Sequence, residues 1–316
     1  MRSITRVGID TSKDTLDVYI DRPGSKRLKV KNDKSGIAQL KSELGGGDHL
    51  IAIEATGRYE SLARHELEAA GHEVKVQNPR KVRRLADGIG TKAKTDRIDA
   101  KFLAKTAELC AASKPRSKER EALGDISRAI NTLKTERSGH LKRIQVPGYS
   151  PVAKRVLKQV IKAFDRQIKK LEEEFEKLVA VSSLAEKYKL VQSIPCVGSN
   201  TARVAVCELP EDIENWSVRQ LSAYAGVAPM DDSSGKRNSP ARVPKHGNFH
   251  IKAALYMPAL GLLKKGGLYA TTYRRLLARG LTHQQAVIPL MHKLLIHIAA
   301  VLKRGTAWEA VPPKKT

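Results

Sequence analysis

Residues 6–20 read Arg6-Val7-Gly8-Ile9-Asp10-Thr11-Ser12-Lys13-Asp14-Thr15-Leu16-Asp17-Val18-Tyr19-Ile20 and decide how the fold is interpreted. Two apolar segments flank a short polar turn, a pattern that predicts two β-strands joined as a hairpin. Asp10 stands at the end of the first strand. The hairpin therefore predicts a carboxylate held at one edge of a sheet.

Three later acidic residues also follow or lie within apolar sequence rather than in a run of charges. Glu54 ends the apolar segment that begins at Leu50, and Asp96 and Asp99 are three residues apart. On a helix that spacing puts both carboxylates on one face. Converging carboxylates repel each other unless a cation lies between them, and Mg²⁺ prefers carboxylate and phosphate oxygens. The pattern predicts a phosphodiester-cutting Mg²⁺ site made of Asp10, Glu54, Asp96 and Asp99.

Composition indicates a polyanionic partner. The 316 residues include 58 Lys and Arg against 33 Asp and Glu, for a formal net charge of +25 and a pI near 10.0. Few metabolic enzymes carry such an excess, whereas nucleic-acid-binding proteins do, because each neutralised phosphate releases counterions. A solvated basic surface without a partner is the bland alternative. A membrane surface is disfavoured because the charge is spread along the whole chain.

Cysteine usage and hydropathy favour a soluble, cytoplasmic protein. The cysteines are Cys110, Cys196 and Cys207, with no C-x-x-C pair, so neither a disulfide framework nor a zinc ribbon is expected. The N-terminus lacks the apolar region of a secretory signal. The apolar segment 286–302 is interrupted by Pro289 and several polar residues, so we expect a core helix too short and too polar to span a bilayer.

The N-terminal third predicts an α/β domain. Strands are expected at 6–20, 27–31, 50–53 and 73–76, and helices after Asn32-Asp33, at 59–70 and at 96–112. This is the order of the ribonuclease-H-like fold, in which the first and fourth strands lie adjacent and carry the first two carboxylates. Residues 81–94 are expected to form a mobile basic loop that orders on nucleic acid, with contacts from Arg83, Arg84, Lys92 and Lys94.

Residues 121–182 change to long helices rich in Lys, Arg and Glu, with a break near Pro147-Gly148. The apolar residues step by three or four positions: Val156, Val160, Phe164, Ile168, Leu171, Phe175 and Leu178. This seam suits a coiled coil or a dimer contact. A helical spacer that packs on its own chain is equally compatible. The predicted division is 1–114 for the catalytic domain, 115–185 for a helical coiled-coil connector and 186–316 for a C-terminal domain.

The C-terminal part predicts a mainly α domain with three features. Residues 191–204 have the form of a helix-hairpin-helix motif, whose turn can face a phosphate, although an ordinary corner between helices is nearly as compatible. A polar, basic loop is expected at 231–239, where Ser234 precedes Gly235 and is flanked by Lys236, Arg237 and Lys245. His246 and His250 have a metal-ligand spacing without a third ligand, which favours ordinary loop or core histidines.

Several motifs together resemble the DEDD transposases of the insertion sequence 110 family. They are Ile9-Asp10 with Lys13, Glu54-Ala55-Thr56-Gly57, Lys94-Thr95-Asp96-Arg97-Ile98-Asp99-Ala100, Ala225-Gly226-Val227-Ala228-Pro229, Ser234-Gly235 and Lys245-His246-Gly247-Asn248. Each motif alone is weak. Their order matches the family over nearly the whole chain.

The resemblance implies a RuvC-like domain whose Mg²⁺-binding tetrad is Asp10, Glu54, Asp96 and Asp99. It also implies a C-terminal transposase domain with a serine nucleophile, placed on Ser234 with neighbouring Ser233 as the alternative. Such a serine would form a phosphoserine-DNA intermediate that allows rejoining without ATP. The implied partners, in the cytoplasm and nucleoid of a bacterium or archaeon, are donor and target DNA, other copies in a dimer or tetramer, and for some members a structured guide (bridge) RNA.

Other readings stay open from the residues alone. A hydrolytic, junction-resolving nuclease would use the tetrad to activate water and leave Ser234 structural. The opening Gly8-Ile9-Asp10 also suits actin-like sugar kinases, but their further glycine-rich phosphate turns are missing from the sequence. In a non-catalytic nucleic-acid scaffold, all four carboxylates would be ordinary caps or surface charges, as we expect for Asp14 and Asp17. Aromatic residues make up only 4% of the chain, so base stacking by the protein is expected to be poor.

Overall fold

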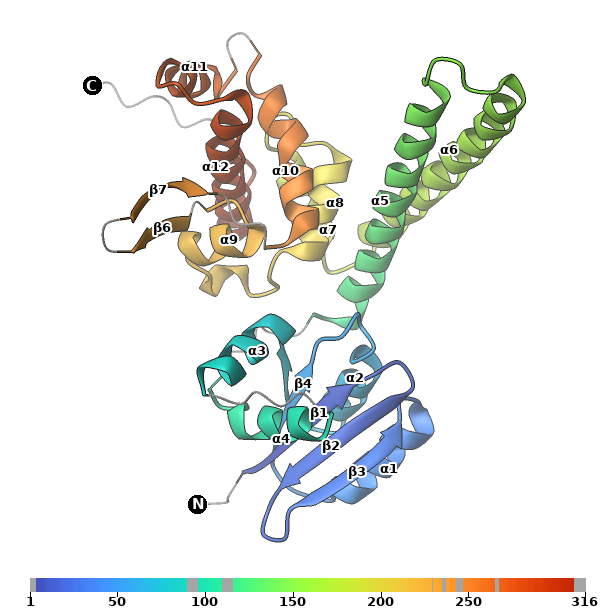
Figure 1. The fold of residues 1–316 in the computed structure, drawn as a ribbon, viewed down its shortest axis with the longest axis vertical. Helices are drawn as coiled ribbons and strands as arrows, with labels where there is room; N and C mark the ends of the chain where they lie inside the picture. The colour runs from blue at the N-terminus through green and yellow to red at the C-terminus, as the bar shows by residue number, and fades with distance from the viewer. Residues whose placement is uncertain are drawn as a thin grey trace. The chain divides into compact units, whose positions relative to one another are not determined.

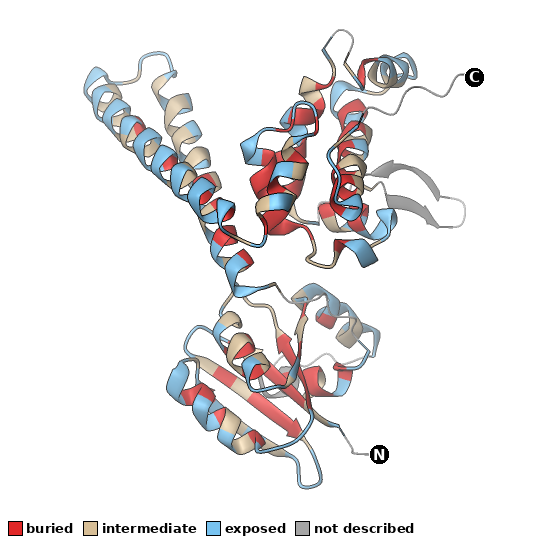
Figure 2. Ribbon diagram, turned by 180° about the vertical axis from the view of Figure 1, so that it is seen from behind, coloured by how far each residue is buried: buried red, intermediate tan, exposed pale blue. Residues whose placement is uncertain are grey.

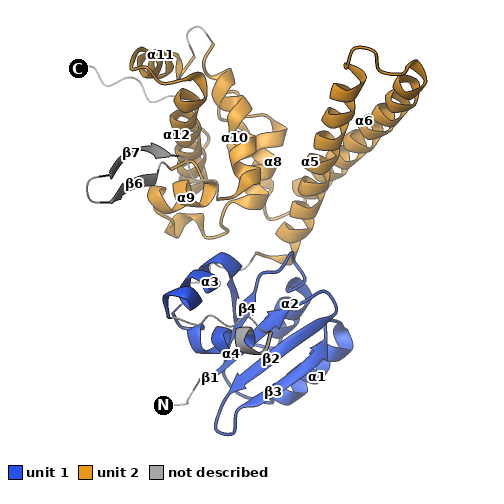
Figure 3. Ribbon diagram, viewed as in Figure 1, with its two compact units in different colours: residues 1–115 blue, residues 116–316 orange. Residues whose placement is uncertain are grey.

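The computed structural model describes residues 4–89, 96–109, 116–228, 230–234, 237–242, 247–264 and 267–309, with the backbone alone for 96–99, 230–234 and 237–242. The chain forms two compact units, residues 1–115 and 116–316 (Figure 3). The helical connector expected at 115–185 belongs to the second unit from residue 116 onward. The proposed three-part division by role stays a prediction.

The first unit is built on a mixed five-stranded sheet (Figure 1). The sheet order is β3-β2-β1-β4-β5, and the strand bounds are β1 Thr5–Thr11, β2 Thr15–Asp21, β3 Lys26–Lys31, β4 His49–Glu54 and β5 Glu73–Gln77. β1, β2 and β3 pair antiparallel, whereas β4 pairs parallel with both β1 and β5. The predicted α/β class, the hairpin and the adjacency of the first and fourth strands are confirmed.

Helices cover both faces of this sheet. α1 (Lys34–Leu44) and α2 (Ser61–Ala69) pack on one face, where Ile37, Leu40 and Leu67 join the apolar side chains of β1, β2 and β4. The Asp33 carboxylate accepts from the Gly36 N–H and caps α1 as predicted. α3 (Pro79–Gly88) and α4 (Asp96–Thr106) pack on the opposite face, with Leu50 and Ala52 of β4.

The expected mobile loop at 81–94 is wrong for its first half. Residues 79–88 form α3, because Asn78 caps its N-terminus, Pro79 occupies the first turn and Val82 is buried against the sheet. Residues 90–95, with Lys92 and Lys94, lie outside the described part of the chain. α4 begins where predicted but ends at Thr106 rather than at Ala112.

α4 lies unusually close to β1. A methyl group added at Gly8 would fall within 2.5 Å of the Ala104 nitrogen and still closer to the Ala100 carbonyl oxygen. Farther along, Arg6 of β1 forms an ion pair of 2.9 Å with Glu108, just after α4. α4 therefore runs antiparallel to β1, and its N-terminus lies at the end of β1 that carries Asp10.

Gly8→Ala tests this close approach. The added methyl group must push α4 away from β1, and overpacking of this kind costs about 1–3 kcal/mol of unfolding free energy. Urea unfolding followed by circular dichroism measures the loss. Gly46→Ala is the matched control, because nothing lies within 4 Å of the methyl group it would add. Equal stability of the two variants would contradict the contact.

The second unit is mainly α-helical, as predicted, and is built around α8, α10 and α12 (Figure 1). Its helices are α5 Lys118–Ile144, α6 Pro151–Ala180, α7 Ala185–Gln192, α8 Ser199–Glu208, the 3-10 turn η1 Ile213–Asn215, α9 Val218–Ala225, α10 Phe249–Gly261, α11 Ala270–Ala278 and α12 His283–Arg304. Nearly all of α8 is buried, from Thr201 to Glu208. The described core of this unit is one continuous apolar cluster.

α5 and α6 form the predicted helical hairpin. They pack against each other, and Ile168 and Phe175 of the seam are buried in the core cluster of the same chain. The seam thus packs within its own chain over these positions, which favours the spacer alternative there. Val156 and Leu178 remain exposed. Much of the surface of the α5–α6 hairpin is exposed (Figure 2).

α12 confirms the expectation of a core helix and corrects one part of it. The helix has 22 residues and a mean hydropathy of 1.6 over its most apolar window, so by length and composition it could cross a membrane. Pro289 and the polar residues do not shorten it as expected. Leu294, Leu295 and Ile298 are fully buried in the core cluster, which identifies α12 as the central helix of this unit.

The expected loop at 231–239 is a β-hairpin. β6 (Met230–Ser234) pairs antiparallel with β7 (Arg237–Arg242), with Ser234 opposite Arg237. Two residues, Gly235 and Lys236, connect the strands in the sequence, and two-residue connections containing glycine are typical of hairpins. The prediction failed because the strand residues are polar and carry no apolar alternation.

Candidate active site

Asp10 and Glu54 occupy equivalent places on neighbouring parallel strands. Ile9 of β1 pairs with Ile53 of β4, and each carboxylate belongs to the next residue. Both residues are half-buried. The parallel register therefore brings these two predicted site residues to the same edge of the sheet.

Strand alternation puts both carboxylates on the face that α4 covers. Gly8, two residues before Asp10, contacts α4, and Ala52, two residues before Glu54, packs with Leu103 of α4. Side chains two residues apart on a strand share a face. Asp10 and Glu54 thus face the N-terminal end of α4.

The structure describes α4 from Asp96, so Asp96 and Asp99 belong to its first turn. Their side chains lie outside the described residues. Within the described part of the chain no group of three or more His, Cys, Asp or Glu side chains gathers as a metal site. Convergence of all four carboxylates stays a prediction, which the placement of the helix N-terminus supports.

Asp17 is a neighbour of this edge that the sequence reading treated as an ordinary surface acid. It lies directly opposite Asp10 in the antiparallel register of β1 and β2, and so on the same face. Lys29 of β3 pairs with the Asp17 carboxylate at 3.0 Å. This ion pair offsets the charge that would otherwise repel Asp10. Counting residues outward from the turn of the predicted hairpin could have shown that Asp10 and Asp17 lie opposite each other.

Asn32 joins the two loops that follow the carboxylate-bearing strands. Its side-chain amide donates to the Ser12 carbonyl oxygen at 3.0 Å and to the Tyr59 carbonyl oxygen at 2.8 Å. In the second of these loops Gly57 and Arg58 adopt positive φ angles of 60° and 78°. A left-handed conformation is costly for arginine, and such strain clusters at functional sites. Asp33 of the predicted Asn32-Asp33 pair caps α1, while Asn32 connects the two loops at this edge.

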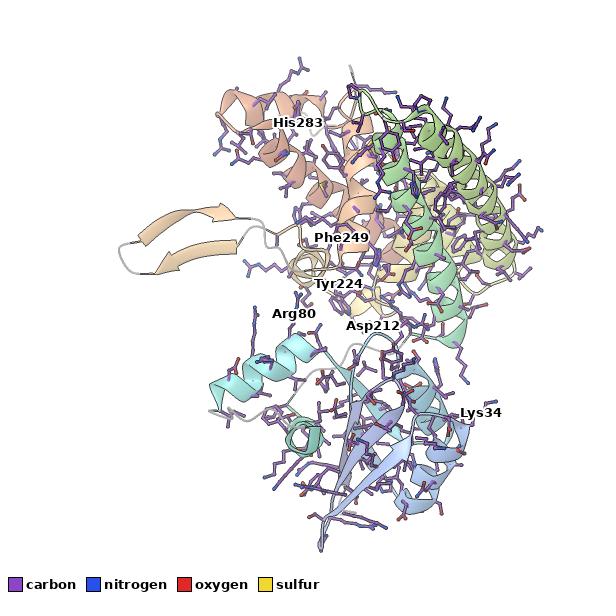
Figure 4. All side chains as sticks on the ribbon, turned by 45° about the vertical axis from the view of Figure 1, so that its right-hand side comes forward. Lys34, Arg80, Asp212, Tyr224, Phe249 and His283 are labelled. Atoms are coloured by element: carbon purple, nitrogen blue, oxygen red, sulfur yellow. The ribbon has the colours of Figure 1, made fainter. Side chains whose placement is uncertain are left out.

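Asn32→Ala removes both loop contacts. We expect a loss of about 1–2 kcal/mol of unfolding free energy, since each hydrogen bond contributes roughly 1 kcal/mol. Thermal and urea unfolding measure this loss. Lys34→Ala is the control, because Lys34 is exposed on the neighbouring helix (labelled in Figure 4). A variant as stable as the control would contradict the bracing role.

The predicted nucleic-acid contacts fall into two groups. Arg83 and Arg84 are exposed on α3, as are Arg80 and Lys81 in its first turn (Arg80 is labelled in Figure 4). Lys92, Lys94, Lys236 and Lys245 lie outside the described residues, and Arg237 is placed on β7 by its backbone alone. α3 therefore presents a basic surface in the first unit, although basic residues in a first turn oppose the helix dipole.

Ser234 is the last residue of β6, immediately before the hairpin connection, and Ser233 pairs with Asn238. The hydroxyl groups of both serines lie outside the described side chains. The structure places the predicted nucleophile at the end of a hairpin. The choice between Ser234 and Ser233 stays open.

The base of this hairpin is held where its two flanking segments meet. A methyl group added at Gly247 would lie 2.6 Å from the Gly226 Cα, so the two backbones are in contact. The Asn248 N–H donates to the Tyr224 carbonyl oxygen at 2.7 Å, next to these glycines (Tyr224 is labelled in Figure 4). Both segments belong to motifs that carried the family resemblance. Their glycines are needed for this contact.

Glu208, at the end of α8, anchors the same junction from the core. Its carboxylate accepts hydrogen bonds from Asn248 at 3.1 Å, from Arg116 at 3.0 Å and from Arg128 at 3.0 Å. Tyr224 donates its hydroxyl to the Glu208 carbonyl oxygen at 2.9 Å. Burial acts to raise the pKa of Glu208, but the positive charges of Arg116 and Arg128 outweigh it, so the pKa is lowered. Sequence reading missed Glu208 because it sits among apolar residues of α8.

The lowered pKa of Glu208 predicts a pH dependence of stability. Such a carboxylate stabilises the fold above its ordinary pKa of 4.5, and this contribution is lost as pH falls through the lower folded value. Glu208→Gln leaves two arginines without their carboxylate. We expect it to cost about 3 kcal/mol at pH 7, the lower end for a broken buried pair, since both guanidinium groups are partly exposed.

Urea unfolding of the wild type and Glu208→Gln from pH 7 to pH 3 checks this. The difference in unfolding free energy must shrink as pH falls below 4.5, because the carboxyl group is then protonated in the unfolded wild type and, below its lowered pKa, in the folded protein as well. Glu211→Gln serves as a control acid close by in the sequence. A difference that stays constant down to pH 3 would contradict the role of the charge.

The predicted helix-hairpin-helix consists of α7, a turn at 193–198 and α8, with Gly198 preceding α8. Cys196 in this turn is exposed and has a φ of 63°, a conformation that favours glycine. Cys207 is buried, and burial raises the pKa of its thiol to about 12. His250 lies in the first turn of α10, and His246 lies outside the described residues.

Comparison with known proteins finds two matching segments, of which the first runs from the first unit through α5 of the second. Residues 7–146 match a transposase family model, DEDD_Tnp_IS110, and residues 188–274 match the model described as Transposase IS116/IS110/IS902 family. The matched segments include the carboxylate edge in the first unit and the serine hairpin in the second. Both matches define a transposase of the insertion-sequence class, and the chain belongs to the IS116/IS110/IS902 family.

Curated relatives carry related names. The chain is 25% identical to the pilin gene-inverting protein of Moraxella bovis over 97% of this chain and 98% of that protein. It is 31% identical to an uncharacterized 43.6 kDa protein of insertion element IS110 from Streptomyces coelicolor, over 42% of this chain and 34% of that protein. It is 32% identical to the transposase of element IS1111A from Coxiella burnetii, over 37% of this chain and 32% of that protein. The chain is a DNA transposase/recombinase.

Proposed function

We propose that this transposase cuts and rejoins DNA by site-specific recombination, using a ribonuclease-H-like, RuvC-like domain in the first unit and a serine nucleophile in the second. The observation that carries the proposal is the placement of Asp10 and Glu54 on neighbouring parallel strands, facing the N-terminal turn that contains Asp96 and Asp99. The sheet order with β1 between β2 and β4 supports the fold assignment.

The donors at this edge fit a divalent metal. Asp10 and Glu54 supply carboxylate oxygens, which Mg²⁺ prefers, and no described cysteine belongs to this unit. Asp10, Glu54, Asp96 and Asp99 would hold Mg²⁺. When bound, Mg²⁺ supplies positive charge beside the scissile phosphate. Asp17 and Lys29 form an ion pair beside Asp10 at the same edge, so Asp17 adds no net charge there.

The serine reaction is a transesterification. A bond forms between the Ser234 Oγ and phosphorus while the bond from phosphorus to the sugar oxygen of the leaving strand breaks, and the serine proton passes to that oxygen. The freed hydroxyl of a DNA end later attacks the phosphoserine ester and restores Ser234. Lys236, Arg237 and Lys245 are proposed to neutralise charge on phosphorus during both steps. The bond energy is kept throughout, so ATP is not required.

The proposed partners follow from the same chemistry. If the serine of one copy acts with the carboxylates of another, assembly of a dimer or tetramer would restrict cutting to the complete complex with donor and target DNA. Few aromatic residues are present for base stacking, which is compatible with sequence reading by a guide RNA and equally with nonspecific binding. The name of the Moraxella bovis relative suggests that DNA inversion is one reaction such a site could catalyse.

Denaturing electrophoresis of the full chain with Mg²⁺, labelled element-end DNA and the RNA of the flanking non-coding sequence tests the proposal. We expect label to migrate with the wild-type protein and to be lost by at least a thousandfold in Ser234→Ala and Asp10→Ala, as typical for removal of a catalytic nucleophile or metal ligand. Ser233→Ala and Asp14→Asn are the matched controls and should retain attachment.

Two results would change the proposal. Cleavage without attachment that survives Ser234→Ala but not Asp10→Ala would identify a hydrolytic nuclease. Attachment that is lost in Ser233→Ala and kept in Ser234→Ala would move the nucleophile by one residue.

A further inference from the structure

The hairpin of α5 and α6 separates its charges along its length. Residues 137–164 contain no Asp or Glu, whereas residues 165–177 contain Asp165 and four glutamates. We call residues 137–164 the basic tip. Its basic residues are Arg137, Lys142, Arg143, Lys154, Arg155, Lys158 and Lys162.

The other half of the hairpin balances its charges internally. Lys134 pairs with Glu172 at 2.6 Å across the two helices, and Lys169 pairs with Glu173 on α6. Among the described residues no ion pair involves Lys142, Arg143, Lys154, Arg155, Lys158 or Lys162. Five of these six residues are exposed, and Lys154 is half-buried. Arg137, at the edge of the tip, pairs with Asp165, whereas the six other cations have no carboxylate partner among the described residues.

The charges lie in an ordered array. A shallow groove is lined by Pro151, Lys154, Arg155, Lys158, Gln159 and Lys162. Lys154, Lys158 and Lys162 repeat every four residues, so they form one stripe about 12 Å long at the 1.5 Å rise of a helix. Phosphates of one DNA strand advance about 3.4 Å along the duplex axis per nucleotide. The stripe thus matches a run of about three to four phosphates.

This arrangement costs stability in the free protein. Like charges four residues apart destabilise a helix by about 0.2–0.5 kcal/mol per pair, and basic residues near a helix N-terminus oppose its dipole. Lys154 and Arg155 lie in the first turns of α6. The tip contributes little to the core, because Val152 and Val156 beside the lysines are more than half exposed. A polyanionic partner is the physical reason for retaining such a stripe.

We propose that the basic tip binds the phosphate backbone of double-stranded DNA, outside the site of strand exchange. This proposal rests on the proposed function only because it requires that the protein acts on DNA. Lys154, Lys158 and Lys162 contact successive phosphates, and Lys142 and Arg143 of α5 add charge next to them. The contact positions the duplex and does not read its sequence.

The test measures binding of the full chain to a labelled 40-base-pair duplex of arbitrary sequence by fluorescence anisotropy from 50 to 300 mM KCl. Mg²⁺ is omitted and Ser234→Ala is the background, so failure of the serine chemistry cannot affect the result. The triple variant Lys154→Gln, Lys158→Gln, Lys162→Gln should lower the slope of log affinity against log salt by about 2–3, near 0.9 per lost phosphate contact. At 150 mM KCl the affinity should fall roughly tenfold or more.

The matched control is Lys169→Gln, Lys170→Gln, Lys177→Gln, which removes the same charge from the acidic half of α6. Its slope should stay within about 0.5 of the parent. Equal effects of both triples would show a net-charge effect and overturn the proposal. A tip triple that binds DNA like the parent, or that changes only the oligomer mass in light scattering, would also overturn it and point to a second copy as the occupant. A single-stranded RNA bound more tightly than the duplex through the tip would assign the surface to RNA instead.

Discussion

The close packing of α4 on β1 is the constraint on which the first unit depends. Gly8 leaves no room for a side chain between the strand and the helix, so the helix axis is fixed at backbone contact. This contact, together with the ion pair of Arg6 and Glu108, sets the direction of α4. The same direction carries Asp96 towards the edge where the parallel register of β1 and β4 presents Asp10 and Glu54. Three polar residues, Asp17, Lys29 and Asn32, complete this edge by charge balance and by hydrogen bonds to the loops.

In the second unit a buried carboxylate, Glu208, connects segments that are far apart in the sequence. Glu208 is almost fully buried and gathers Arg116, Arg128 and Asn248, which come from segments far apart in the sequence. A buried carboxylate is tolerated only when it is paired and hydrogen-bonded, so this network specifies how α5, α8 and the segment before α10 meet. Gly226 and Gly247 are in backbone contact at the base of the β6–β7 hairpin, in which Ser234 is the last residue of β6.

Electrostatics is organised differently in the two halves of the α5–α6 hairpin. Cross-helix pairs such as Lys134 with Glu172 stabilise the half next to the core, whereas the basic tip concentrates cations that repel each other. The net charge of +25 is therefore not distributed evenly along the chain. α3 and the basic tip each carry a dense share of it, and each is held by few buried residues. Repulsion within such surfaces is relieved when anions neutralise them.

Much of this molecule could be predicted from the sequence, because the signals were local. Apolar alternation identified β1 and β2, and Asp33 marked a helix start. Asp10 and Glu54 were selected because they end apolar runs, and Asp96 and Asp99 because they are three residues apart. The hairpin at β6 and β7 and the helix α3 were missed, since polar strands lack alternation and the basic run at 80–84 looks like a loop. Asp17, Asn32 and Glu208 were missed for another reason. Their roles exist only through partners distant in sequence, at a register or a buried junction that folding creates. The sequence by itself thus determined the order of elements and the acidic residues. Only the tertiary structure decided which of them meet, because strand register and close packing are set by contacts between distant segments.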